Sequence, residues 1–218
     1  MDRKDIRKLV VKEFGAYAKS KGFKRNGTSL FWYKEQNDII CYIGYECASD
    51  IRPYYAIQPH YIGLEPVCLS WSKLISHCHY REYSLYDEWE DNVNVENLNR
   101  LIKYFDDGVL DMVLSYCDPK RLTGDLPFTQ LCMPRDKLEL NGFSKLYLGD
   151  YNGAIEALVL AKEDFTSNKH LDFVIEMAKN HKELVPHYLL YLIDKSKRIL
   201  LSFEDYRSWR DSVSQKNS

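Results

Sequence analysis

The chain has 218 residues, enough for one large domain or two small ones, and its 45% hydrophobic content indicates a buried core and excludes a disordered chain. No apolar stretch is long enough to span a bilayer, and the charged start, Met1 to Asp5, leads into no apolar signal segment. We therefore expect a cytoplasmic protein. Its six cysteines form no Cys-x-x-Cys pair, which favours buried thiols over a disulfide framework.

The net charge of −2 conceals two oppositely charged stretches. Residues 1 to 25 carry nine basic side chains against three acidic ones, a balance of +6. Residues 82 to 111 carry nine acidic side chains against two basic ones, a balance of −7. Unless the two stretches neutralise each other in the fold, they predict one basic and one acidic surface.

Apolar residues at helical spacing predict a first helix over residues 3 to 21, which Gly22 ends. Strand patterning follows over residues 30 to 33, 39 to 47 and 54 to 62, the first two strands being joined by a polar turn at residues 35 to 38. In the second strand one face is predicted to point into the core; it carries Ile39, Cys41, Ile43, Tyr45 and Cys47. Trp32 and Tyr42 should be buried with them.

The third of these strands contains Pro59, which donates no hydrogen bond to a sheet, so we expect this strand at an edge or a bulge. Residues 66 to 71 are a candidate fourth strand. Residues 72 to 93 show no clean period and are expected to form a long, partly structured loop, the first place to look for a functional site.

Asn94 is a good N-cap for a second long helix that reaches Cys117, with a kink expected at Gly108. Pro and Gly between residues 118 and 134 mark a boundary, after which helices are expected over residues 136–148, 151–165, 170–180 and 183–203. The predicted fold class is α+β. An antiparallel meander of three to four strands packs against two long helices in residues 1–120, an all-helical C-terminal part covers residues 134–205, and residues 206–218 form a polar tail.

The first helix, the turn Gly22-Phe23-Lys24 and the aromatic strand Leu30-Phe31-Trp32-Tyr33 resemble a bacterial α+β domain family of unknown function over about residues 4–120. The long segment from 72 to 93 departs from that family's pattern. The resemblance implies a fold and a bacterial setting, and it transfers no catalytic residue.

Residues 136 to 165 are similar to a tetratricopeptide-like helical hairpin. The similarity rests on Tyr147-Leu148-Gly149-Asp150-Tyr151, followed by Ala154 and Ala161. Gly149 would end the first helix in a left-handed turn, Tyr151 would fill the gap between the helices, and Ala154 would allow their close approach. One such unit is too few for a solenoid, so an ordinary helical hairpin is the alternative.

Residue types for catalysis are sparse. His77, Cys78 and His79, with Cys68 and His60 before them, have metal-ligand chemistry but lack a Cys-x2-Cys knuckle or a helical His pair. Cys68 and Cys78 have no Gly-rich backbone nearby to form an oxyanion hole, and no phosphate-binding glycine loop occurs. We therefore expect no cofactor, no metal and no catalytic residue; a metal- or Cys-dependent enzyme is the third hypothesis.

The acidic segment from residues 80 to 91 carries aromatic rings at a spacing of three, which on a helix would form one stripe bordered by acids. The predicted partner-binding residues are Tyr83, Tyr86, Glu88, Trp89, Glu90 and Asp91. They favour a non-catalytic protein-binding module with a basic protein partner, such as an immunity- or antitoxin-like protein or a defence-system accessory. The same rings could instead cap the core.

The alternative is a nucleic-acid-binding module that uses the exposed side of the first helix. That side carries Arg3, Lys4, Arg7, Lys8 and Lys12. The rings that follow closely are candidates for stacking on bases; they are Phe23, Phe31, Trp32 and Tyr33. The non-functional alternative is that this Lys-rich side is simply the solvent-exposed side of an amphipathic helix.

Overall fold

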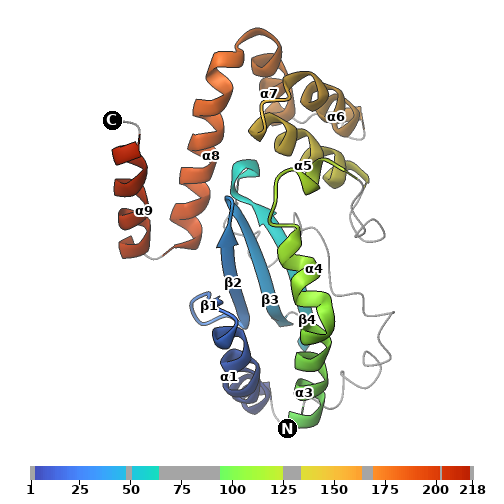
Figure 1. Ribbon diagram of the computed structural model, residues 1–218, viewed down its shortest axis with the longest axis vertical. Helices are drawn as coiled ribbons and strands as arrows, with labels where there is room; N and C mark the ends of the chain where they lie inside the picture. The colour runs from blue at the N-terminus through green and yellow to red at the C-terminus, as the bar shows by residue number, and fades with distance from the viewer. Residues whose placement is uncertain are drawn as a thin grey trace. The chain divides into compact units, whose positions relative to one another are not determined.

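The computed structural model describes residues 3–47, 51–63, 94–124, 134–163, 169–201 and 203–216. The chain divides into two compact units. Unit 1 comprises Met1–Gln58 and Leu74–Asp118, and unit 2 comprises Pro59–Lys73 and Pro119–Ser218. The predicted α+β fold class is confirmed, with an antiparallel sheet, helices beside it and an all-helical C-terminal part (Figure 1). No described helix is both long and apolar enough to cross a membrane.

Unit 1 begins with helix α1 (Arg3–Ser20), whose buried side carries Val10, Phe14 and Ala18. The helix ends as predicted at Gly22, which has a φ of 81°. There the amide of Phe23 donates to the carbonyl of Ala18 over 3.0 Å, the bond that closes a helix whose last residue turns left-handed. This turn leads the chain directly into the sheet.

Four strands form one antiparallel sheet in the order β1-β2-β3-β4 (Figure 1). Their bounds are β1 (Lys24–Arg25), β2 (Phe31–Gln36), β3 (Ile39–Cys47) and β4 (Ile51–Pro59). Asn37 and Asp38 join β2 to β3 with φ angles of 52° and 56°, the left-handed pair that suits a two-residue hairpin turn. The predicted meander is confirmed, and Pro59 ends β4 at an edge of the described sheet. The candidate strand at residues 66–71 lies outside the described residues.

Both faces of β3 are buried. Ile39, Cys41 and Ile43, on the predicted core face, are fully buried, and so are Ile40 and Tyr42 on the opposite face. The prediction of a single core face was therefore incomplete, because period-two spacing tells which residues share a face and does not tell whether the other face is covered. Tyr42, like Trp32, is buried as predicted.

An aromatic core joins α1 to the sheet and to the second helical segment of unit 1. The ring of Phe14 lies 5.5 Å from that of Trp32, 5.4 Å from that of Tyr45 and 5.8 Å from that of Phe105, centroid to centroid. Tyr55 on β4 meets Phe105 edge-on at 6.2 Å. Such tilted and edge-on pairs are the favourable ring geometries, so this cluster fixes how α1 lies on the sheet.

The second helical segment is kinked as predicted. It consists of α3 (Val95–Tyr104), the π-turn η3 (Phe105–Val109) and α4 (Leu110–Ser115). The side chain of Asn94 caps α3 by accepting the amide of Asn97 over 2.9 Å. At Gly108 φ is 117°, which breaks the helical path and separates α3 from α4.

Unit 2 contains the predicted hairpin, formed by α5 (Pro134–Tyr147) and α6 (Tyr151–Glu163) (Figure 1). Gly149 has a φ of 82° and ends the first helix. Gly142 allows the close approach, because a Cβ there would lie 2.5 Å from Cγ of Leu158. Ala154 of α6 is fully buried, and its small side chain also allows the two helices to approach closely.

The short helical turn η1 (His60–Ile62) follows β4 and is buried against α5 and α8 (Val185–Leu200). The remaining elements of unit 2 are η4 (Arg121–Thr123), α7 (Lys169–Asn180), η5 (Lys182–Leu184) and α9 (Phe203–Lys216). The hydroxyls of Tyr61 and Ser144 hydrogen-bond over 2.9 Å, and the hydroxyl of Ser196 donates to the carbonyl of His60 over 2.9 Å. The residues predicted as a polar tail instead form most of helix α9.

Candidate functional site

The residues predicted to bind a protein partner lie outside the described residues. They are Tyr83, Tyr86, Glu88, Trp89, Glu90 and Asp91, and the metal-type cluster His77, Cys78 and His79 lies there too, with Cys68. Among the residues that the structure describes, no group of three or more His, Cys, Asp and Glu is placed to hold a metal ion. The protein-binding surface therefore stays a prediction.

The basic residues of α1 lie on the side of the helix that faces away from the aromatic core. Arg3 begins the helix, and Lys4, Lys8 and Lys12 follow one another at four-residue spacing, which places them in one row. The side chains of Lys8 and Lys12 are 67% and 79% exposed. The row is available to a ligand because burial of the opposite side turns it outward.

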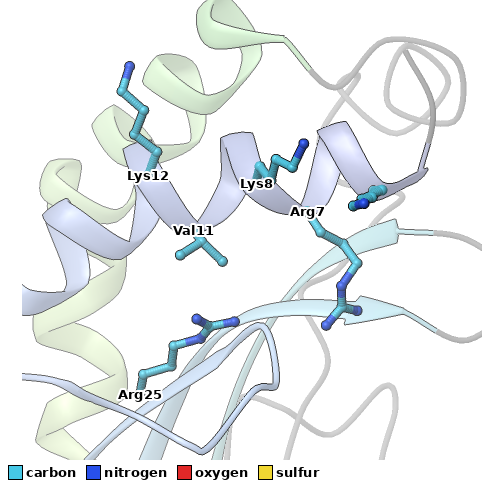
Figure 2. Close-up of a pocket in the computed structure, with 6 residues that line it drawn as sticks. Arg7, Lys8, Val11, Lys12 and Arg25 are labelled. Atoms are coloured by element: carbon cyan, nitrogen blue, oxygen red, sulfur yellow. The ribbon is translucent and has the colours of Figure 1, made fainter.

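Arg25 of β1 completes this surface, which we call the basic face: Lys4, Arg7, Lys8, Lys12 and Arg25. These residues and Val11 line an open depression of about 600 Å³ on unit 1. Figure 2 shows Arg7, Val11 and Arg25 extending into the same space beside the helix, whereas Lys12 points away from it. The two arginines therefore form the centre of the depression and the lysines extend it along α1.

Main-chain carbonyls hold the two arginines in place. Nη2 of Arg7 donates to the carbonyl of Thr28 over 3.2 Å, and Nη2 of Arg25 donates to the same carbonyl over 3.0 Å. Nε of Arg25 also donates to the carbonyl of Ser29 over 2.7 Å. Its guanidinium lies 5.8 Å from the centre of the Trp32 ring, a cation–π distance. These partners orient the guanidinium groups without neutralising them.

Arg25 lies close enough to Arg7 for the charge of Arg7 to act on it. Burial, and after it the positive charge of Arg7, lowers the pKa of Arg25 from its ordinary value. An arginine remains protonated in proteins, so the shift reflects the cost of keeping this cation partly buried and, after it, repulsion by Arg7. An anion between the guanidinium groups would relieve that repulsion.

Two lysines of the basic face have acidic neighbours on α1 itself. Lys8 pairs with Asp5 at 3.1 Å, and Lys12 pairs with Glu13 at 2.8 Å. The hydrogen bond that the ammonium of Lys12 donates to Glu13 is the main cause of the raised pKa of Lys12. Exposed pairs of this kind are weak and screened by salt, so both lysines can exchange these partners for those of a ligand.

Among the described residues of the acidic stretch, Asp106 pairs with the far end of α1. Lys21, just beyond the helix, pairs with Asp106 of η3 at 2.8 Å, and the hydroxyl of Tyr17 donates to the same carboxylate over 3.1 Å. The hydrogen bond from Lys21 is the largest cause of the lowered pKa of Asp106. Lys4, Arg7, Lys8 and Lys12 occupy the first three turns of the helix, away from its Lys21 end.

The aromatic rings near the basic face are buried, which agrees with the predicted burial of Trp32 and rules out the alternative that these four rings stack on bases. Phe23, Phe31, Trp32 and Tyr33 are 3%, 8%, 3% and 7% exposed. Packing between α1 and the sheet encloses the ring of Trp32, which lies against Phe14 on one side and carries Arg25 over it. An aromatic strand thus forms core here rather than a stacking platform.

Arg25, which turns the helix row into a depression, is not among the residues that the sequence predicts for this surface. It belongs to the basic stretch of residues 1 to 25, but the predicted surface is confined to the first helix. The missing signal is the pairing of Arg25 with Trp32 between β1 and β2, in a strand of two residues. So short a strand has no detectable period.

Comparison of the chain with models of known families, with curated proteins and with solved structures found no match. The function is therefore inferred from the residues of the basic face.

Proposed function

We propose that the protein is a non-catalytic nucleic-acid-binding module whose basic face contacts the phosphate backbone. The observation that supports it is the pair Arg7 and Arg25, whose guanidinium groups converge on one carbonyl, that of Thr28, in an open depression lined by five cations. Guanidinium groups are the donors best suited to phosphate, because their fixed fork matches its oxygens. Lys4, Lys8 and Lys12 supply further charge along the helix.

A lipid surface fits this face less well. Helices that lie on membranes insert an exposed apolar side between the headgroups. The apolar side of α1, with Val10, Phe14 and Ala18, is fully buried in unit 1. The helix therefore offers a lipid only charge.

An acidic protein also fits less well. Protein interfaces depend on a desolvated centre of aromatic and aliphatic anchors. Among the described residues, Val11 is the one apolar side chain that lines the depression, and the described rings nearby are buried. Interfaces with nucleic acid are by contrast polar and strongly positive, which is the composition of the basic face.

The test is binding of a labelled mixed-sequence DNA, followed by fluorescence anisotropy over a range of salt. If all five cations contact phosphates, log affinity should fall with log salt at a slope of up to about −4.5, about 0.9 for each phosphate. The triple variant Arg7→Ala, Lys8→Ala, Lys12→Ala should lose most of the binding.

The matched control removes the same charge from exposed lysines of unit 2, through Lys169→Ala, Lys179→Ala and Lys216→Ala. It should bind as the wild type does. Absence of salt-sensitive binding, or equal losses in both triple variants, would show that the basic face is not the site. Binding to anionic vesicles but not to DNA would replace nucleic acid by lipid as the ligand.

A basic protein partner is the second proposal, and the balance of −7 in residues 82 to 111 favours it. It makes the acidic and aromatic segment the contact, in an immunity- or antitoxin-like role. Trp89→Ala would then remove an anchor for that partner and leave DNA binding unchanged. Loss of DNA binding in Trp89→Ala would contradict the division of the two surfaces.

A further inference from the structure

We infer that the basic face selects double-stranded over single-stranded nucleic acid. The inference rests on the proposed function and names the class of ligand. It follows from two properties of the described residues: the face offers charged donors, and the described rings beside it, Phe23, Phe31, Trp32 and Tyr33, are buried and so cannot stack on a base.

These rings are buried by packing between α1 and the sheet. A base could stack on them only if that packing were disrupted. The ring of Trp32 is 3% exposed and has Phe14 at 5.5 Å and the guanidinium of Arg25 at 5.8 Å. Gly15 brings the main chain of α1 close to the same ring, since a Cβ there would lie 2.9 Å from it. A base would therefore have to displace both α1 and Arg25 to reach Trp32.

Single strands depend on such rings. Each base stacked on an aromatic side chain raises the affinity for a single strand by roughly five- to 150-fold, and the surfaces specialised for single strands combine a basic groove with several such rings. The basic face has the charge without the rings. A single strand therefore gains only the electrostatic part of its usual binding.

That electrostatic part is larger for a duplex. A duplex carries one charge per roughly 1.7 Å, and each neutralised phosphate contributes a salt slope of about 0.9, against about 0.7 for a single strand. For the five cations of the basic face the difference amounts to about one power of the salt concentration. If both forms bind equally at about 1 M salt, the duplex binds on the order of tenfold more tightly at about 0.1 M.

The fixed positions of the two arginines also favour a ligand whose phosphates are fixed in space. Arg7 comes from α1 and Arg25 from β1, and the shared carbonyl of Thr28 sets the distance between their guanidinium groups. A duplex presents its phosphates at regular positions, whereas a flexible single strand must be ordered to match them. The ordering costs entropy, which again favours the duplex.

The experiment compares a labelled mixed-sequence DNA duplex with each of its strands alone and with a thymine-only strand of the same length. Anisotropy titrations at several salt concentrations should give about tenfold tighter binding to the duplex near 0.1 M salt, with the steeper slope. Arg25→Ala should reduce duplex affinity by roughly ten- to hundredfold and lower the slope by about 0.9.

Arg25→Lys is the matched variant, because it keeps the charge and loses the planar fork. It should weaken duplex binding while leaving the slope near that of the wild type, and circular dichroism of both variants checks that unit 1 stays folded. Single strands that bind as tightly as the duplex overturn the inference and leave the proposed function standing. Absence of binding to all these DNAs overturns the proposed function itself.

Discussion

Lys197 of α8 is buried in unit 2 and is charged at neutral pH. Replacing it tests whether this buried charge destabilises the fold. The residue is 2% exposed, and its ammonium lies 5.4 Å from the ring of Trp209 on α9. Burial lowers the pKa of Lys197 to about 8. We expect Lys197→Met, which keeps an unbranched apolar stem and removes the charge, to stabilise the protein at pH 7.

The magnitude follows from the two pKa values. The ordinary pKa of 10.5 applies to the unfolded chain, so the difference of about 2.5 units makes the buried charge cost about 3 kcal/mol at pH 7. The cation–π contact with Trp209 returns about 0.5 to 1 kcal/mol. The expected gain from Lys197→Met at pH 7 is therefore about 2 to 3 kcal/mol.

The gain should depend on pH in a defined direction. Because the folded pKa lies below the unfolded one, the unfolded chain binds more protons between about pH 8 and pH 10.5, and wild-type stability rises with pH in that window. The advantage of Lys197→Met should accordingly shrink by about 2 kcal/mol between pH 7 and about pH 9.5.

Guanidinium unfolding followed by far-ultraviolet circular dichroism measures the free energy of unfolding at both pH values, and hydrogen exchange of α8 amides reports on unit 2 separately. Lys179→Met, at an exposed lysine of α7, is the control and should change little at either pH. A Lys197→Met variant that loses stability at pH 7, by an amount independent of pH, would refute the reasoning, because the charge would then stabilise the fold.

Two further predictions concern β3. Ile43 is fully buried, so Ile43→Ala should lower the free energy of unfolding by about 2 to 5 kcal/mol in the same denaturation assay, and an unchanged midpoint would mean that the side chain is not in the core. Gly44→Ala should cost about 2 to 4 kcal/mol, because φ is 151° there and a Cβ would collide with the carbonyl of Leu30. Gly124→Ala, in open space with a φ of −108°, is its control and should be nearly silent.

Features set by neighbouring residues could be predicted from the sequence. Asn94 caps α3, Gly22 ends α1 and Gly108 breaks the second helical segment, each through a bond or backbone angle within a few residues. The hairpin turn at Asn37 and Asp38 belongs to the same class, because its two left-handed residues are local. Such signals do not depend on how distant elements pack.

Features that depend on packing between distant elements could not be predicted from the sequence. Whether Trp32 faces a ligand or the core depends on Phe14 in α1, and the position of Arg25 depends on a two-residue strand and on the carbonyl of Thr28. The periodicity of the sequence indicates which residues share a face of an element. It does not indicate which faces of distant elements pack together. The sequence therefore indicated the charges of the proposed site, and it left open whether the neighbouring rings face a ligand or the core.

The described acidic residues of unit 1 bear on how a chain of net charge −2 could bind a polyanion at the proposed site. Asp106 is used internally, by Lys21 and the hydroxyl of Tyr17, while Asp107 and Asp111 are exposed nearby on η3 and α4. At physiological salt the screening length is about 8 Å, so a ligand on the basic face feels its cations more than acids farther away. At low salt the screening length grows to about 30 Å at 0.01 M, and repulsion by the acids reaches the ligand. The gain in affinity on lowering the salt should therefore level off at low salt for the wild type, and a plot of log affinity against log salt that stays straight would mean that the acids face away from the bound ligand.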